Sequence, residues 1–422
     1  MTETPRPRTL LVISQVYVPD PASVGQHMHD VAVEMARRGW RVIVYTSARG
    51  YEDPTAHYPA RETVDGVEVR RLPLSSLGKK TIRARVAGGL LFIGQATLRA
   101  LLAPRGSRML ISTSPPMCAA AAMAVSTLRR FPIVYWVMDM NPDQAVVMGK
   151  ARAGSAPVRA LDTLNRMILR RASEVVALDR FMADRLHRKR DVTDKLSIMP
   201  PWPHEDALEV VEHEHNPFRA RHGLDGKFVI MYSGNHSPAN PLDTLLAAAE
   251  RLRDRKDIVF MFVGGGLAKR EVDAAVAAGA PNIVSLPYQP MSELRYSLSA
   301  ADCHVVTLGD DVVGMVHPCK VYGAMAVARP VLFFGPHPSH VSDLIDAHQI
   351  GAQVSHGDVD GAVRAIEAMC AAAPEARRAM GERAREAVRR SLSKNALCGR
   401  FCDVVEGRRA ASAAPAAPEA AA

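Results

Sequence analysis

The chain has 422 residues, of which 48% are hydrophobic and 23% are charged, and its formal net charge at pH 7 is +9. This composition excludes a disordered or fibrous protein and leaves room for two sizeable cores. The positive charge favours phosphorylated ligands, polyanions or an anionic membrane surface as partners.

The first half of the chain alternates apolar strand-like runs with helical patterns. Runs typical of buried strands begin at Leu10, Arg41, Arg108, Phe131 and Glu174, and the run near Val67 predicts an edge strand. Residues 25–39 carry apolar side chains at helical spacing and end at a glycine. Such alternation predicts a doubly wound, mostly parallel sheet.

A proline-rich break divides the chain near its middle. Three prolines lie between Ser197 and Glu205, where regular structure cannot continue. We therefore expect one domain over residues 1–200 and a second over 201–395. Residues 396–422 should add a terminal helix and a disordered tail of alanine and proline.

The second half repeats the alternation, with strand-like runs that begin at Phe228, Ile258, Asn282, Cys303 and Val331. Two α/β domains joined by a short linker should face each other across a cleft. In open parallel sheets, ligands bind outside the carboxyl ends of the strands. Ligand-binding residues are therefore expected in the loops that follow each strand.

Two of these loops in the second domain are rich in glycine. Gly234, Asn235 and His236 follow one strand, and Gly264–Gly266 and Lys269 follow the next. Small residues let a backbone approach a ligand closely, so the loops predict a cradle for a nucleotide diphosphate. The alternative is that the glycines only form tight strand-to-helix turns.

The segment from His317 to Val331 predicts a short helix that faces an anion. Pro318 suits the first helical position, and Lys320 lies in the first turn, where free N–H groups already favour phosphate. A cation at that place would stabilise a departing diphosphate. The alternative is a surface lysine on an ordinary packing helix.

Two aspartates follow the strand at Phe131. Asp139 and Asp143 would therefore point toward the cleft, where a carboxylate can orient an acceptor hydroxyl or act as its base. The alternative is a helix N-cap. The loop before Gly25 lacks the GxGxxG fingerprint, which argues against hydride chemistry on NAD.

A basic cluster precedes an apolar helical pattern in the first domain. Lys79, Lys80, Arg83 and Arg85 come before residues 86–103. This pairing is typical of a helix that lies at a membrane interface. The alternative is a core helix with a solvated basic end. The basic residues lack interleaved aromatic side chains, so we expect no nucleic-acid binding.

Together these segments resemble the retaining glycosyltransferases of family 4, closest to the branch that builds exopolysaccharide and O-antigen repeat units. The resemblance extends to about Arg390 and is most specific over PCKVYGAMAVARPVL, residues 318–332. Asp139 with Pro142 matches a D-x-x-P element of this branch. The family fold is GT-B, in which two Rossmann-like domains of doubly wound parallel sheets face each other.

The resemblance implies transfer of a sugar from a nucleotide-diphosphate donor to a hydroxyl, with retention of configuration and no obligatory metal or other cofactor. It implies catalytic roles for Asp139, Lys320 and His236, and acceptor binding by Gly25 and Asp139. The implied donor-binding residues are Gly234, Asn235, Gly265, Gly266, Lys269, Gln289, His317 and Lys320. The DVD sequence at Asp358 is expected to be a helix cap rather than a metal ligand.

The chain departs from the family pattern at several positions. Met315 and Gly323 stand where many members have two glutamates, Cys319 replaces a serine, and Ala328 replaces a glycine. Met138 stands in place of a catalytic histidine of some members. These changes leave open how the donor sugar and ribose are held.

The acceptor class of the family implies a polyprenyl-diphosphate-linked glycan. We therefore expect a cytoplasmic protein that binds peripherally at the inner face of the cell membrane. Six scattered cysteines and the absence of a signal-like apolar segment agree with that compartment. Two alternatives stay open, namely a nucleotide-sugar 2-epimerase and a non-catalytic scaffold that binds a nucleotide-sugar.

Overall fold

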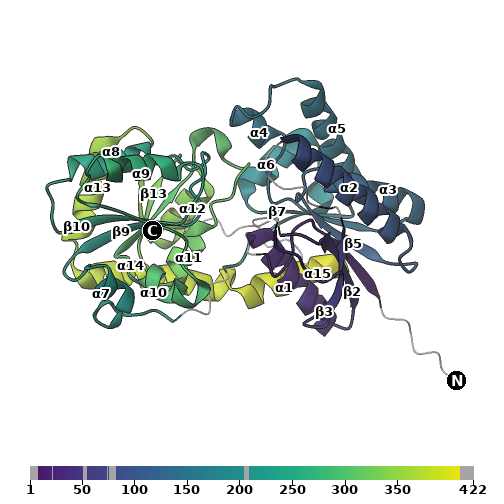
Figure 1. The fold of residues 1–422 in the computed structure, drawn as a ribbon, viewed down its shortest axis with the longest axis horizontal. Coiled ribbons are helices and arrows are strands. Elements are labelled where there is room, and N and C mark those ends of the chain that lie inside the picture. The colour runs from purple at the N-terminus through teal and green to yellow at the C-terminus, as the bar shows by residue number, and fades with distance from the viewer. Residues whose placement is uncertain are drawn as a thin grey trace, which may run out of the picture. The chain divides into compact units, whose positions relative to one another are not determined.

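The computed structural model describes residues 8–20, 22–50, 55–73, 75, 82–203 and 209–408, without the side chains of Ile82, Arg83 and Arg85. The chain forms two compact units (Figure 1). Unit 1 comprises Met1–Pro201 with Asn395–Ala422, and unit 2 comprises Trp202–Lys394. The predicted tail from Ala410 lies outside the described residues, as do Lys79 and Lys80.

Unit 1 is built on an eight-stranded sheet in the order β3-β4-β2-β1-β5-β6-β7-β8. All neighbouring strands are parallel except β3 and β4. The strands are β1 (Thr9–Ile13), β2 (Arg41–Ser47), β3 (Arg61–Val64), β4 (Val67–Leu72), β5 (Arg108–Ser112), β6 (Ile133–Trp136), β7 (Glu174–Ala177) and β8 (Leu196–Ile198).

The expectation that the run near Val67 forms an edge strand is wrong. This run is β4, which pairs with β2 on one side and is covered by β3 on the other. The covering strand reads RETV and alternates exposed and half-buried side chains. Because its composition is polar, it lacks the apolar pattern by which buried strands are recognised in a sequence.

Helices cover both faces of the sheet in unit 1. The helices α2, α3 and α5 lie along one face, and α1 and α15 lie on the opposite side (Figure 1). The helices are α1 (Ser23–Arg37), α2 (Ile82–Leu101), α3 (Cys118–Arg129), α4 (Asp143–Val147), α5 (Ala156–Arg171), α6 (Arg180–Lys189) and α15 (Lys394–Glu406).

The last helix of the chain returns to unit 1. Phe401 and Cys402 of α15 are fully buried, and the Phe401 ring lies 4.2 Å from that of Trp136 on β6. Arg38, just after α1, binds Asp403 and Glu406 at 2.6 and 3.1 Å. The terminal helix is thus part of the first folded unit rather than a separate appendage.

Unit 2 contains a six-stranded parallel sheet in the order β11-β10-β9-β12-β13-β14. From β9 the chain proceeds outward to β11 and then returns beside β9 as β12, so the strand order reverses between β9 and β12. The strands are β9 (Phe228–Ser233), β10 (Ile258–Val263), β11 (Ile283–Leu286), β12 (Cys303–Thr307), β13 (Val331–Phe334) and β14 (Gly351–Val354).

Each face of this sheet has its own apolar core. Along β9, Phe228, Ile230 and Tyr232 join one core, whereas Val229 and Met231 join the other. Burial on both faces explains the uninterrupted apolar run in the sequence. The helices are α7 (Pro217–Arg221), α8 (Asp243–Arg251), α9 (Lys269–Ala277), α10 (Leu294–Ser299), α11 (Lys320–Ala326), α12 (His340–His348), α13 (Val359–Ala371) and α14 (Pro374–Ala387).

These two sheets confirm the predicted fold class of two Rossmann-like, parallel α/β units. Within the described part of the chain, none of the helices has the length and hydrophobicity that crossing a bilayer requires.

Candidate functional site

The loops that were expected to bind a ligand in unit 2 lie where the strand order reverses. The β9 loop begins at Gly234, and the segment after β12 leads to α11 and Lys320. At such a point the loops of neighbouring strands diverge and leave room for a ligand at the carboxyl edge. The sheet topology thus brings the Gly234 and Lys320 segments together.

Lys320 lies directly against the β9 loop. A Cβ atom at Gly234 would stand 3.0 Å from Lys320 Cε, so the absence of a side chain at Gly234 admits the lysine. Lys320 Nζ lies 5.2 Å from the centre of the Tyr232 ring, and burial lowers the lysine's pKa to about 8. None of the described carboxylates pairs with Lys320. The site therefore holds a desolvated cation without a carboxylate counter-charge among the described residues.

The two glycine-rich loops interlock through their backbones. Gly264 has φ +130°, and a Cβ atom there would lie 2.1 Å from the carbonyl oxygen of Gly234. Gly266 has φ +126°, and its Cβ would lie 2.4 Å from Asn235 Oδ1. The N–H of His236 donates to the Gly265 carbonyl at 2.7 Å. These glycines are thus required by the contact between the loops, before any ligand is considered.

His236 lies beneath the loops with no exposed surface. Its Nδ1 lies 3.0 Å from the Gly234 carbonyl oxygen, and its ring packs edge-on to Tyr232 with the centroids 4.7 Å apart. Burial lowers its pKa to about 4, so the imidazole is neutral near pH 7. Its Nε2 is buried without a hydrogen-bond partner among the described residues. In this arrangement the side chain supports the loop from below.

Lys269 directs its ammonium into the protein. It donates to the carbonyl oxygens of Phe262, Gly264 and Leu286, at 3.1, 3.1 and 2.6 Å. All three donors of the ammonium are therefore engaged. In this arrangement Lys269 ties the end of β10 to the end of β11 and stiffens the glycine-rich loop.

His317 is part of a polar chain within unit 2. Its Nε2 lies 2.7 Å from the hydroxyl of Tyr322, and this hydroxyl lies 2.8 Å from Nε2 of His340. His317 and Tyr322 are buried. The three side chains connect the start of α12 to the turn that precedes Lys320, so they fix the position of that turn.

The turn after β11 presents an exposed ring that the sequence patterns do not single out. The side chain of Gln289 forms a hydrogen bond within its own turn, in which its Nε2 donates to the Pro287 carbonyl at 3.0 Å. Tyr288 is 60% exposed, and its ring covers Gly265, where a Cβ atom would lie 3.1 Å from Tyr288 Cε2. The feature of the sequence that could have identified Tyr288 is an aromatic residue between two turn-forming residues, Pro287 and Gln289.

The helix at Lys320 begins later in the sequence than predicted. It begins at Lys320, so the expectation that Pro318 occupies the first helical position is wrong; Cys319 is the N-cap residue. It ends at Ala326, and Ala328 has φ +53°. A Cβ atom at Gly381 on α14 would lie 1.9 Å from the carbonyl oxygen of Ala328 and would clash with it. Close packing of α14 therefore accompanies the left-handed residue that follows the helix.

In unit 1, Asp139 follows β6 and is half-buried. Its N–H donates to Thr113 Oγ1 at 3.1 Å, and burial raises its pKa to about 6. The N-cap of α4 is Pro142, which makes no side-chain cap bond, so Asp139 does not cap that helix. Asp143 instead pairs with Lys189 at 2.8 Å. The two aspartates therefore have different environments.

Gly25 lies within the first turn of α1 and is packed against its own loop. A Cβ atom there would lie 3.0 Å from Tyr17 Cα, so the glycine lets the β1 loop fold back onto the helix. The prediction that Asp358 caps a helix is confirmed, because its side chain accepts from the Gly361 N–H as the N-cap of α13.

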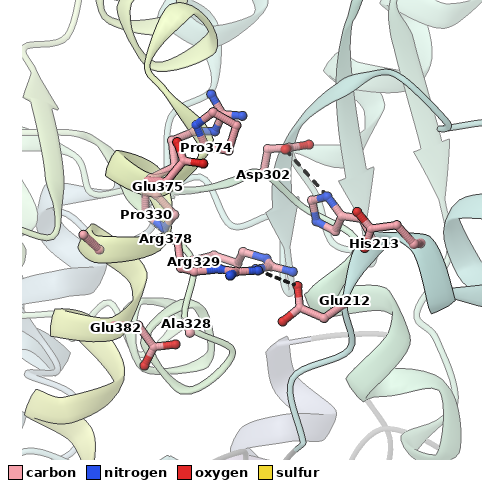
Figure 2. A pocket seen from close by; sticks show the side chains of 13 residues that line it. Glu212, His213, Asp302, Ala328, Arg329, Pro330, Pro374, Glu375, Arg378 and Glu382 are labelled. Carbon is pink, nitrogen blue, oxygen red and sulfur yellow. Dashed lines mark hydrogen bonds and ion pairs between the residues drawn. The ribbon is translucent and has the colours of Figure 1, made fainter.

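A separate cavity of about 450 Å³ lies at the amino ends of β12 and β13 (Figure 2). Its charges pair largely with one another: Arg378 binds Glu212 at 3.4 Å, and His213 lies 3.8 Å from Asp302. Arg329 donates to the Ser299 carbonyl at 2.9 Å. These contacts fasten the segment that enters unit 2 to α14, at the edge of the sheet away from Lys320.

Two family models match the chain in succession. The model described as "Glycosyl transferase 4-like domain" matches residues 23–202, and "Glycosyl transferases group 1" matches residues 215–387. Among curated proteins, the probable glycosyltransferase WbjE of Pseudomonas aeruginosa is 24% identical over 86% of this chain and 89% of the relative. The putative colanic acid biosynthesis glycosyl transferase WcaI of Escherichia coli is 25% identical over 75% of this chain and 81% of the relative.

Solved structures show the same fold. Sucrose-phosphate synthase of Thermosynechococcus elongatus superposes with a TM-score of 0.72 at 16% identity, over 95% of this chain and 98% of that one. HepE of Anabaena, solved with UDP and glucose, gives 0.70 at 14% identity, over 95% of this chain and 100% of that one. WaaG, a glycosyltransferase involved in lipopolysaccharide biosynthesis, gives 0.66 at 17% identity, over 94% and 100%.

Proposed function

Because this chain belongs to the family 4 glycosyltransferases of the GT-B fold, we propose that it transfers a sugar from a nucleotide-diphosphate donor to an acceptor hydroxyl with retention of configuration. The observation that carries the proposal is the position of Lys320. It is a half-buried, desolvated cation without a described carboxylate partner, and it lies against the glycine loop where the strand order reverses.

A diphosphate is the ligand that suits the environment of Lys320. Bringing a lysine out of water is unfavourable unless an anion compensates it. Two phosphate groups beside Lys320 would supply that charge and would return the lysine's pKa toward its usual range. HepE of Anabaena was solved in complex with UDP-glucose, which supports a nucleotide-sugar as the donor.

The proposed reaction exchanges one bond at the anomeric carbon. The bond from that carbon to the diphosphate oxygen breaks, and a bond to the acceptor oxygen forms on the same face. The acceptor proton passes to the departing diphosphate, whose growing negative charge Lys320 stabilises. Since the lysine supplies the positive charge, we propose that the reaction needs no obligatory metal ion.

We assign the remaining residues by their environment. Gly234, Asn235, Gly265 and Gly266 would form the wall of the donor pocket through their backbones. His236, Lys269 and His317 would act as positioning residues, since their polar atoms contact the loops or the turn beside Lys320.

For the acceptor, we propose binding in unit 1 near Asp139 and Gly25. A carboxyl group with a pKa of about 6 and no described side-chain partner is suited to accept a hydrogen bond from a hydroxyl. The relative WcaI is named for colanic acid biosynthesis, which supports a role in polysaccharide synthesis. We propose that the acceptor is a lipid-linked glycan intermediate of cell-surface polysaccharide synthesis. The protein would then work at the cytoplasmic face of the membrane.

The experiment is a thermal-shift and calorimetric panel of nucleoside diphosphates and nucleotide-sugars on three proteins. The wild type should bind one of them, and Lys320→Met should weaken that binding by about 10- to 100-fold through loss of a charged contact. Lys256→Met, at an exposed lysine of the same unit, should leave it unchanged.

Three outcomes would contradict parts of the proposal. Equal affinity of Lys320→Met and wild type for the preferred nucleotide would remove Lys320 from the donor site. With donor and acceptor supplied, NMR of the product should show the anomeric configuration of the donor. An inverted product would contradict retention, and conversion of the donor without acceptor would favour an epimerase.

A further inference from the structure

The cavity at the amino ends of β12 and β13 is lined by unit 2 alone, on the side of the sheet away from the Lys320 loops. Its volume of about 450 Å³ lies within the range of pockets that hold small molecules. Its floor includes the half-buried Arg329, whereas its rim is exposed. The rim carries Arg378 and the carboxylates of Glu212, Glu214, Glu375 and Glu382.

Arg329 in the floor uses only part of its guanidinium. Its Nη2 donates to the carbonyl oxygens of Ser299 and Val211, at 2.9 and 3.4 Å. Its Nε is buried without a hydrogen-bond partner, and its Nη1 makes no hydrogen bond to the described residues. Burial lowers the pKa of Arg329, because a charge held away from water is unfavourable. An anionic group that reaches Nη1 would compensate that charge.

The other ionisable groups of the floor are already engaged. Asp302 accepts from Arg219 at 3.2 Å and from the Val229 N–H at 2.9 Å. Arg377 donates to carbonyl oxygens at the end of α13. Burial lowers the pKa of His213, so its imidazole is neutral near pH 7. Arg329 therefore supplies the positive charge that the floor offers to a ligand.

The rim adds a loose ion pair next to Arg329. Arg378 and Glu212 lie 3.4 Å apart, with side chains 71% and 55% exposed, and both charges act on Arg329 (Figure 2). An exposed pair of this kind contributes about 1 kcal/mol or less, so opening it costs little. A carboxylate bound by the two arginines would leave Glu212 free to accept from an ammonium group beside that carboxylate.

The remaining rim groups select against an acidic ligand. Glu214, Glu375 and Glu382 have no ion-pair partner among the described residues. Like charges brought together are unfavourable, so these carboxylates would repel a simple anion and would attract a further cation. Pro330 and Pro374 contribute apolar surface to the lining, against which aliphatic carbon atoms can pack.

We propose that this cavity binds a free α-amino acid and prefers one with a basic side chain. Its carboxylate would bind Arg329 and Arg378, and its α-ammonium would donate to Glu212. A cationic side chain would then reach Glu375 or Glu382 at the rim. This binding does not depend on the proposed sugar transfer, so either proposal can fail without the other.

The test is isothermal titration of the full-length protein with L-lysine, L-alanine, L-glutamate, acetate and phosphate at matched ionic strength. L-Lysine should bind most tightly, and L-glutamate, acetate and phosphate at least tenfold more weakly. Arg378→Gln should weaken L-lysine binding by about tenfold or more, through loss of a charged contact. The control Arg251→Gln breaks another exposed ion pair of unit 2, with Asp360 at 3.3 Å, and should change binding by less than about twofold.

A second variant tests the preference for a basic side chain. In Glu375→Gln/Glu382→Gln, L-lysine and L-alanine should bind with similar affinity, since the carboxylates that attract the second cation are gone. Urea unfolding shows that each variant is folded. The proposal is overturned if L-lysine does not bind, if acetate or phosphate binds as tightly, or if Arg378→Gln binds like the control. A preference for L-lysine that persists in the double variant would overturn the assignment of the rim glutamates.

Discussion

Asp139 and Asp143 are only four residues apart, and their contacts predict opposite effects of the same substitution. Desolvation of the half-buried Asp139 raises the pKa of its carboxyl to about 6, whereas Asp143 pairs with Lys189 at 2.8 Å. A raised carboxyl pKa means that folding favours the protonated form, so its contribution to stability falls as pH rises from about 4 to 6. At pH 7 the ionised Asp139 therefore costs stability.

We predict that Asp139→Asn raises the free energy of unfolding at pH 7 by about 1–3 kcal/mol while glycosyl transfer falls at least tenfold. Asp143→Asn should lower stability by about 1 kcal/mol, since it breaks an ion pair. Urea unfolding at pH 7 and at pH 4.5 measures both. The gain for Asp139→Asn should shrink at the lower pH; an equal gain at both would assign it to packing.

Lys320 predicts a pH dependence of nucleotide binding. Its pKa without ligand is about 8, and a bound diphosphate would raise it. Affinity should thus be highest below pH 8 and should fall roughly tenfold between pH 7 and pH 9 as the free lysine loses its proton. Isothermal titration over this range tests the expectation. In Lys320→Met the affinity should be flat, and a matching decline in this variant would assign the effect to another group.

At individual positions, sequence patterns identified the site segments but not the direction of each side chain. Proximity of Lys320 to Gly234 could be inferred because both follow strands of one parallel sheet. The hydrogen bonds from Lys269 to three carbonyls could not be inferred, since a lysine after a glycine loop can point toward a ligand or into the protein. The contact of Tyr288 with Gly265 depends on tertiary packing between two loops, which no local pattern encodes.

At the level of elements, the apolar strands were predictable and the short polar ones were not. The runs at Arg41, Phe228 and Ile258 correspond to β2, β9 and β10 because both sheet faces are buried there. The strands β3, β8 and β14 are only three or four residues long, and β3 and β14 are largely polar or small in composition. Their pairing is determined by the neighbouring strands that they cover, so their own sequences carry little signal.

The interlocked glycine loops predict a sharp contrast between two glycines. Gly264→Ala would place a Cβ 2.1 Å from the Gly234 carbonyl oxygen, and both loops would have to move. We expect a loss of about 2–4 kcal/mol in stability and loss of nucleotide binding. Gly279→Ala is the control, because Gly279 also has positive φ but no atom within 4 Å, and it should cost about 1 kcal/mol.

Thermal denaturation with and without nucleotide measures both glycine variants. If Gly264→Ala bound nucleotide like the control, the loop contact would be irrelevant to the site. If both variants were equally destabilised, backbone conformation alone would account for the loss.

At the scale of the whole molecule, the two units differ in continuity, because unit 2 is one continuous segment and unit 1 consists of two. Unit 2 is continuous from Trp202 to Lys394 and contains both of the apolar cores that cover its sheet. Unit 1 needs a segment from the end of the chain, because α15 buries Phe401 and Cys402 within it. The proline break predicted the division near residue 200, but no local pattern indicated that the last helix returns to the first unit.

This asymmetry predicts different behaviour of the isolated units. A fragment of residues 202–394 should fold, give a cooperative urea transition and bind the preferred nucleotide within about threefold of the full chain, since its apolar cores and the Lys320 site are internal. A fragment of residues 1–201 should expose the apolar surface that α15 covers and should aggregate or lack a cooperative transition.

Adding residues 394–408 as a separate peptide provides the control for the unit 1 fragment. The peptide should restore folding, and a peptide with Phe401→Ala should do so far less well because it removes a fully buried ring next to Trp136.

Arg38→Ala in the full chain should weaken the same contact and lower the free energy of unfolding by about 1–2 kcal/mol. Arg37→Ala, at an exposed neighbouring position, should leave that free energy almost unchanged. A unit 1 fragment that folds cooperatively without the peptide would show that α15 is dispensable, and the contacts of Arg38 would then contribute little to stability.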